Sequence, residues 1–228
     1  MKNDFEKYAL SRGISSTKLD GYKKYSLKNY RGVNPIILEE REMNVIGLDV
    51  FSRLLFDRIL FLGTPIDDDC ANIINSQLMY LNSIGDEDVK MFINSPGGNV
   101  ISGLAIYDVM NYITPDVSTY CMGMCASMGS ILVSSGTRGK RYALPNGEIM
   151  LHQVSGGAEG AFSDMQIAVK HAGRLQDKLY NILAENTGKT FEEIQKDADR
   201  DNWLTAEESL PGVFGKYGLI DEIIKAAK

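Results

Sequence analysis

The stretch Gly123-Met124-Cys125-Ala126-Ser127-Met128-Gly129-Ser130 marks a change from an apolar segment to a run of small residues. Residues 117–122 before it have the apolar character of a buried strand, and residues 128–134 after it lack proline and charge, as a core helix would. A serine at this junction stands at a helix N-terminus, where unpaired N–H groups and the helix dipole favour developing negative charge. Ser127 is therefore a candidate nucleophile. The alternative is that small residues here only let a strand and a helix pack closely.

The segments around this junction alternate between strands and helices. Strands followed by helices are typical of a parallel sheet with helices outside it, and right-handed crossovers favour a stacked spiral of βαβ units. We therefore predict an α/β fold in which loops at strand ends carry the functional groups. The predicted strands are residues 59–62, 89–93 and 147–151, and the predicted helices are residues 49–59, 67–83, 101–113 and 191–196.

A long amphipathic helix is predicted to begin at a capping box formed by Ser163 and Gln166 and to end at Gly188. Apolar residues recur along one stripe of these roughly 25 residues, which would extend about 37 Å. Such a helix is too long for one small core, so we expect it to project and to mediate homo-oligomerisation. Leu175 and Leu179 are expected to be buried only where two copies meet. The alternative is a helix packed wholly within one chain.

Composition places the protein in a broad class. A chain of 228 residues that is 44% hydrophobic fits a single globular domain, and a net charge of −6 gives no reason to propose a nucleic-acid partner. We find no signal peptide and no apolar run that would span a membrane. Cys70, Cys121 and Cys125 have no metal-ligand spacing and are interpreted as reduced thiols. A cytoplasmic location is therefore expected.

The first part of the chain differs from the rest. Residues 1–32 hold eight Lys or Arg against three acidic residues, with little apolar periodicity. We predict that residues 1–33 form a mobile basic leader or propeptide, and that residues 34–228 form one domain.

A serine nucleophile needs a base, and the chain contains only two histidines. His152 follows a short apolar strand and precedes a glycine-rich loop, a position where catalytic side chains are often placed. His171 lies within the long amphipathic helix beside charged residues and is interpreted as a solvated surface histidine. His152 is therefore the candidate base, although it could instead be a histidine with no role in chemistry.

A carboxylate that orients the histidine would complete a triad. Asp197, Asp199 and Asp201 all lie in one charged turn, and position alone does not distinguish them. Charged runs are mostly solvated surface, which is the alternative for each of the three. After this turn, Thr205 and Glu208 predict a capping box that opens another helix.

Five motifs together closely resemble the ClpP family, the proteolytic subunits of the Clp protease. The resemblance covers about residue 34 to the C-terminus, with the motifs in the family's order. Two places depart from the family pattern: Val154 stands where a proline is usual, and residues 210–216 carry a short insertion. The motifs are residues 92–98 (FINSPGG), 123–129 (GMCASMG), 139–146 (GKRYALPN), 150–153 (MLHQ) and 199–203 (DRDNW).

The resemblance implies a ClpP/crotonase-like spiral with a projecting handle helix. It selects Asp201 as the acid of the triad and implies an oxyanion hole formed by the backbone N–H groups of Gly98 and Met128. It also implies two stacked heptameric rings working with an AAA+ unfoldase of the ClpX, ClpA or ClpC type. ATP would be used by that partner, and no cofactor or metal is expected on this chain, which lacks a GxxxxGK[ST] loop.

The predicted function is therefore that of a serine endopeptidase that degrades unfolded polypeptides to short peptides inside a closed chamber. Ser127 would attack, His152 would transfer protons and Asp201 would orient His152. Two other classes of function remain open at this point. One is a crotonase-type acyl-CoA enzyme, which would not need the three residues together, and the other is a non-catalytic ring subunit.

Overall fold

The computed structural model describes residues 36–41, 44–212 and 215–225, and the chain divides into two compact units, residues 1–57 and residues 58–228. The predicted leader, residues 1–33, and its boundary at residue 34 lie outside the described residues.

The first unit contains a hairpin and a short helix. Strands β1 (Ile36–Arg41) and β2 (Asn44–Asp49) pair antiparallel, with Ile36 opposite Asp49. Helix α3 (Val50–Phe56) follows directly, and the carboxylate of its N-cap residue Asp49 accepts a hydrogen bond from the Ser52 N–H at 3.0 Å. The helix lies within the predicted residues 49–59 but ends earlier.

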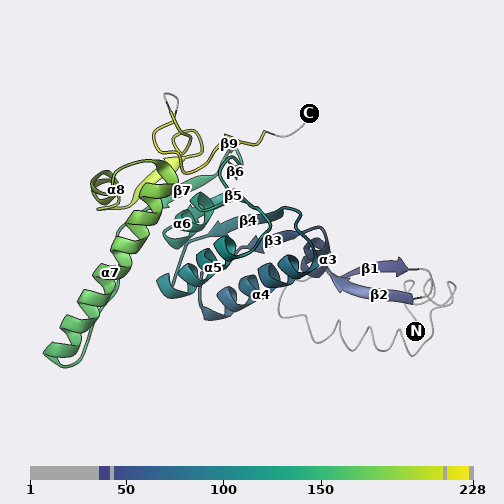
Figure 1. Cartoon of the computed structure of the whole chain (residues 1–228), viewed down its shortest axis with the longest axis horizontal. Helices are drawn as coiled ribbons and strands as arrows, with labels where there is room; N and C mark the ends of the chain where they lie inside the picture. Colours follow the sequence, from purple (N-terminus) through teal and green to yellow (C-terminus); the bar gives the residue numbers. More distant parts are fainter. Residues whose placement is uncertain (1–35, 42–43, 213–214, 226–228) are drawn as a thin grey trace, which may run out of the picture. The chain divides into compact units, whose positions relative to one another are not determined.

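The second unit is built on a mostly parallel sheet (Figure 1). Its main path runs β3, β4, β5, β6 and β9, and all four of these pairs are parallel. Strand β7 pairs parallel with the last part of β5, and β8 pairs antiparallel with β7. The bounds are β3 (Ile59–Leu62), β4 (Val89–Ser95), β5 (Val117–Ala126), β6 (Arg141–Ala143), β7 (Glu148–Leu151), β8 (Asn202–Thr205) and β9 (Glu222–Ile223).

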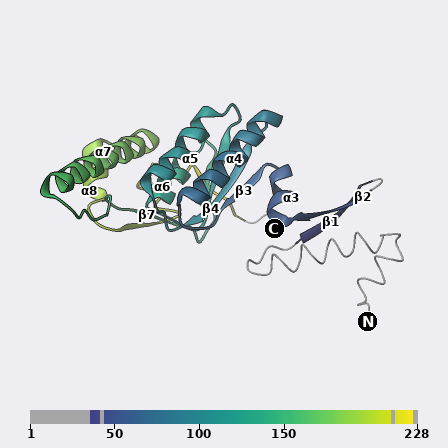
Figure 2. The same cartoon turned by 90° about the horizontal axis from the view of Figure 1, so that it is seen from below.

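Three helices cover one face of this sheet: α4 (Asp68–Ile84), α5 (Val100–Tyr112) and α6 (Met128–Ser134) (Figure 2). Their apolar residues Leu78, Ile106 and Leu132 are completely buried. The alternation of strands and helices follows the predicted α/β order, and α6 has the predicted bounds. This layered arrangement places the end of β5 and the start of α6 in the interior of the unit.

Strand β5 is longer than the predicted residues 117–122. Its pairing with β4 shifts register between Ile93 and Ser95, and Gly123 has φ 82°. At this bulge the Met124 N–H donates to the Asn94 side-chain oxygen at 3.2 Å, so a side chain satisfies a donor that the ladder leaves unpaired. The strand therefore continues to Ala126, and Ser127 comes immediately after its end.

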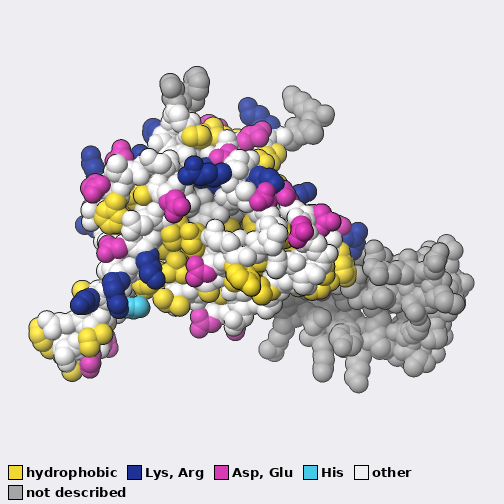
Figure 3. All heavy atoms as spheres, in the orientation of Figure 1, with side chains coloured by type: hydrophobic (Ala, Val, Ile, Leu, Met, Phe, Trp, Pro, Cys, Tyr) yellow, Lys and Arg dark blue, Asp and Glu magenta, His cyan; other side chains and the backbone are white. Residues whose placement is uncertain are grey.

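Helix α7 (Phe162–Thr187) extends away from the sheet (Figure 1) and ends at Gly188 with φ 78°, as predicted. The predicted capping box is wrong: Ala161 is the N-cap residue, and no side chain caps the helix start. Three large apolar side chains of the first half are exposed, Phe162, Ile167 and Val169, and hydrophobic side chains gather at the free end of the helix (Figure 3).

The second half of α7 packs within the chain. Leu179 is only 8% exposed and Leu183 only 3% exposed. The expectation that Leu179 is buried only between two copies is therefore wrong, because it already lies in the core of a single chain. Helix α8 (Phe191–Asp197) follows and begins at a complete capping box of Thr190 and Glu193.

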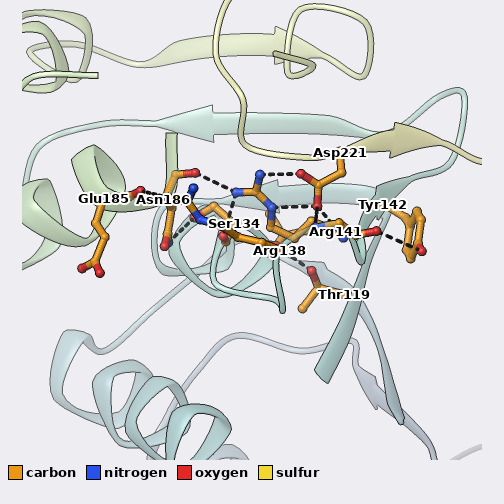
Figure 4. Close-up of polar contacts among 10 residues, drawn as sticks. Thr119, Ser134, Arg138, Arg141, Tyr142, Glu185, Asn186 and Asp221 are labelled. Carbon is orange, nitrogen blue, oxygen red and sulfur yellow. Dashed lines mark hydrogen bonds and ion pairs between the residues drawn. The ribbon is translucent and has the colours of Figure 1, made fainter. Parts of the chain in front are cut away.

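A buried arginine anchors the C-terminal end of α7 (Figure 4). The Arg141 guanidinium donates to the Asp221 carboxylate at 2.6 and 3.0 Å. It also donates to the backbone oxygens of Ser134, the last residue of α6, at 3.2 Å and Asn186 at 2.8 Å. One side chain thus holds β6, α6, α7 and the C-terminal segment together.

At the end of β8, Thr205 and Glu208 form the predicted reciprocal hydrogen bonds. Residues 206–209 form only a turn, however, so the predicted helix is wrong. Within the described residues, no helix has the length and apolar character needed to cross a membrane.

Candidate active site

Ser127 occupies the sharp junction between β5 and α6. Its backbone has φ 55° and ψ −121°, a conformation that residues other than glycine rarely adopt. The Ser127 N–H donates to the Met150 backbone oxygen at 2.9 Å, which fixes the junction to β7. Strain of this kind persists only where surrounding structure enforces it, and it is concentrated at functional sites.

His152 reaches Ser127 because of the pairing of their strands. Ala126 of β5 lies opposite Met150 of β7, so the residues that follow the two strand ends emerge at the same edge of the sheet. The His152 Nε2 atom lies 2.8 Å from the Ser127 Oγ atom, within hydrogen-bond distance. A histidine in this position can act as the base for the serine hydroxyl.

Asp201 is brought to His152 by the antiparallel strand β8. Leu151 of β7 lies opposite Asn202 of β8. His152 and Asp201 are the next residues beyond this last pair, so they lie across from each other at the end of the ladder. The distance from His152 Nδ1 to Asp201 Oδ1 is 3.4 Å, and the Asp201 side chain is 64% exposed. This contact is therefore longer than an ideal charge-assisted hydrogen bond and more exposed to water.

The other two aspartates of the charged turn have different surroundings. Asp197 accepts a hydrogen bond from the Tyr217 hydroxyl at 2.6 Å, and Lys189 lies 3.7 Å from it. Burial raises the pKa of Tyr217, and the bond to Asp197 raises it further. The backbone oxygen of Asp199 accepts a hydrogen bond from the side chain of Gln153, the residue after His152. Of the three aspartates, the structure brings the carboxylate of Asp201 to His152.

A glycine turn lies directly against the serine. A Cβ atom at Gly97 would lie 2.6 Å from the Ala126 oxygen and 2.8 Å from the Met128 nitrogen, so only glycine fits there. Within the described part of the chain, the N–H groups of Gly98 and Met128 donate no hydrogen bond to the protein. Both predicted oxyanion-hole donors are thus free to bind an oxygen atom near Ser127.

A pocket opens beside Ser127 and His152. One wall is apolar and comes from α6 and α7, through Ile131, Leu179 and Leu183. Gly98 and Gln153 also line it. A pocket with an apolar wall and a few convergent polar groups is the usual form of a site that accepts a substrate side chain.

Two further observations bear on the candidates from the sequence. His171 is exposed on α7, next to Arg174, and takes no part in the cluster around Ser127. Among the described residues, no group of His, Cys, Asp and Glu side chains could hold a metal ion. The sequence assigned no role to Gln153. Its side chain donates a hydrogen bond to the backbone oxygen of Asp199, a residue 46 positions away in the chain.

Together these groups form a candidate site for acyl transfer. A serine hydroxyl contacts a histidine, a carboxylate lies at the other ring nitrogen, and two free N–H donors flank the serine. This is the combination of nucleophile, base, orienting acid and oxyanion donors that serine hydrolases use on several unrelated folds.

Comparison with known proteins gives one consistent result. Residues 41–227 match the family model described as Clp protease. Similar curated proteins are named "ATP-dependent Clp protease proteolytic subunit". One, from Porphyromonas gingivalis, is 47% identical over 225 residues, which cover 98% of each chain. Another, from Bacteroides fragilis, is 48% identical over 225 residues, covering 97% of this chain and 98% of the relative.

Proposed function

The chain belongs to the Clp protease family, and we propose that it is the proteolytic subunit of an ATP-dependent Clp protease. In this proposal it is a serine endopeptidase that cleaves unfolded polypeptides to short peptides. The observation that carries the proposal is the contact of Ser127 Oγ with His152 Nε2 at 2.8 Å beside two unpaired N–H donors. The family match favours this function over a crotonase-type acyl-CoA enzyme.

The first half of the reaction forms an acyl-enzyme. The Ser127 oxygen attacks the scissile carbonyl carbon while His152 Nε2 takes the hydroxyl proton. The N–H groups of Gly98 and Met128 donate to the oxyanion of the tetrahedral intermediate. His152 then gives its proton to the leaving amine, and the carbon–nitrogen bond breaks to release the C-terminal peptide fragment.

The second half restores the serine. A water molecule loses a proton to His152 as its oxygen attacks the acyl carbon, and the Ser127 oxygen leaves with that proton. In both halves Asp201 holds the ring so that Nε2 faces Ser127, and it stabilises the imidazolium form. Neither half needs a metal ion or a bound cofactor, so we propose none for this chain.

The substrate would bind as an added strand. Ile66 bonds to the Gly97 oxygen and the Asn99 N–H, so the polar groups of Gly98 point away from Ile66. An extended peptide could pair with this free edge and with the loop that follows His152. Backbone pairing tolerates many sequences, which suits a degradative protease, and the apolar wall of the pocket would receive one side chain.

We further propose that the chain works as a homo-oligomer of two stacked heptameric rings in the cytoplasm. The exposed apolar stripe in the first half of α7, which includes Phe162 at 71% and Val169 at 67% exposure, supports a contact between copies. An AAA+ unfoldase of the Clp family would supply unfolded chains and consume ATP. No contact with nucleic acid or a membrane is proposed.

A direct test compares wild type with Ser127→Ala in cleavage of a short fluorogenic peptide that needs no unfoldase. Removal of one hydroxyl changes packing little, so the variant should fold and assemble normally. Loss of the nucleophile lowers turnover by about 10⁶ in a studied serine protease. Residual activity within tenfold of wild type would refute Ser127 as the nucleophile, and an inactive wild-type particle would favour the non-catalytic ring subunit.

A further inference from the structure

The strand ladder that aligns the candidate triad stops one residue short of it. The last antiparallel pair of β7 and β8 is Leu151 with Asn202. His152 and Asp201 are the next residues on either side, beyond the last pair. Backbone pairing therefore fixes only one side of the His152 and Asp201 contact.

The Gln153 side chain makes a hydrogen bond on the other side of the His152 and Asp201 contact. Its Nε2 atom donates to the Asp199 backbone oxygen at 2.7 Å. This bond joins the residue after His152 to the second residue before Asp201, in the place where the ladder would have continued. The Arg200 side chain also reaches the Asp199 oxygen, but at 3.3 Å and from the neighbouring residue, so it makes no link to the histidine strand.

Asp201 depends on such support because its own contacts are weak. Its side chain is 64% exposed and lies 3.4 Å from His152 Nδ1. An exposed carboxylate at this distance has little to hold it, since water and salt screen the attraction. The position of Asp201 is therefore set by the backbone of its turn.

We propose that Gln153 is a positioning residue that holds the Asp199–Asp201 turn against His152, an inference that rests on the proposed peptidase function. The Gln153 carboxamide acts through the Asp199 oxygen and does not contact the reacting atoms. Without this bond the turn loses its side-chain hydrogen bond to the histidine strand and keeps the Leu151–Asn202 pair and the bond from the Asp199 N–H to the Lys196 oxygen at 3.5 Å, so that Asp201 moves away from His152 Nδ1. A displacement of about 1 Å in a catalytic group can reduce the rate on the order of a hundredfold.

The test uses the assembled wild-type particle and two variants that lack the donor, Gln153→Leu and Gln153→Glu. Peptide cleavage is measured to give kcat and KM separately. We expect kcat to fall by about ten- to a hundredfold in both variants, with KM within about twofold of wild type. Gln195 lies exposed on α8, so Gln195→Leu is the matched control for a polar-to-apolar change and should keep wild-type kinetics.

The KM value and a double-mutant cycle separate positioning from other roles. Gln153 lines the pocket, so a substrate-contact role would raise KM with kcat unchanged, and this outcome would overturn the proposal. If Gln153 acts through Asp201, adding Gln153→Leu to Asp201→Asn should cause almost no further loss. A full additional loss in the double variant would show a general structural effect and would also overturn it. If the leucine variant fails to assemble, the glutamate variant decides between these outcomes.

Failure of this inference is distinguishable from failure of the proposed function. A wild-type particle that does not cleave the peptide contradicts the peptidase assignment itself. A wild-type particle that does cleave it, together with Gln153 variants of unchanged kcat, contradicts only the positioning role.

Discussion

The buried ion pair of Arg141 and Asp221 makes a quantitative prediction about stability. The Arg141 side chain is 7% exposed and that of Asp221 is 21% exposed, and the guanidinium makes two further hydrogen bonds to backbone oxygens. Removing one partner of a buried pair costs about 3–5 kcal/mol, because the other charge is left uncompensated. Since Asp221 keeps some contact with water, we expect Asp221→Asn to lower the free energy of unfolding by about 3 kcal/mol at pH 7.

The loss should depend on pH. Burial favours the protonated form of Asp221, but hydrogen bonds from the Arg141 side chain and from the Arg141 and Gly139 N–H groups outweigh it and lower its pKa. In the unfolded chain an aspartate titrates near about pH 3.9. The stabilisation is therefore fully present above that pH and is lost as pH falls toward the lower pKa of the folded state. The difference between wild type and Asp221→Asn should shrink accordingly below about pH 4.

Urea unfolding followed by circular dichroism at one fixed subunit concentration gives the comparison, because assembly affects apparent stability. The control is Asp88→Asn. Asp88 pairs with Lys140 at 2.6 Å, but the two side chains are 43% and 32% exposed, and Asp116 also contacts this lysine. A surface pair of this kind contributes at most about 1 kcal/mol. If both variants lost the same small amount at pH 7, or if the Asp221→Asn loss stayed constant to pH 3, the buried-pair reasoning would be wrong.

Three other predictions concern activity and assembly. Asp201→Asn should lower kcat for peptide cleavage by about 10⁴, as loss of the histidine tautomer does in other triads. Asp199→Asn should have little effect on kcat. The reverse result would show that the wrong aspartate was chosen. Gly97→Ala should lower activity on the order of a hundredfold, because its Cβ would displace the Ser127 backbone. Gly188→Ala has a similar φ of 78° but open space around it, so it should keep peptidase activity, and equal losses in the two variants would contradict the steric argument. Val169→Glu places a charge in the exposed stripe of α7 and should yield folded single rings in sedimentation, whereas a full-sized particle would show that this stripe is not the interface.

The sequence predicted correctly those helix bounds that depend on residues close together in the chain. The apolar run and the absence of proline and charge in α6 gave its bounds, and Gly188 marked the end of α7. Ser127 and His152 could be chosen from the sequence because each stands just after an apolar strand. Asp201 could not be separated from Asp197 and Asp199 by position, and its selection came from resemblance to the ClpP family.

The errors arose where distant parts of the chain decide the structure. Strand β5 continues past Gly123 because Asn94, on the neighbouring strand, supplies an acceptor at the bulge. Leu179 belongs to the same apolar stripe as the exposed Val169, but only the tertiary fold shows that it is buried. The link from Gln153 to Asp199 likewise depends on the pairing of β7 with β8. Long-range contacts of this kind leave no periodic pattern in the sequence.

Treating the assembled protein with a fluorophosphonate and mapping the adduct by mass spectrometry tests directly whether Ser127 is an activated nucleophile. The reagent requires a serine oxygen activated by a base, so it tests the contact of Ser127 with His152. We predict one adduct at Ser127 that disappears in the His152→Ala variant. No labelling of Ser127, or labelling that persists without His152, would contradict it.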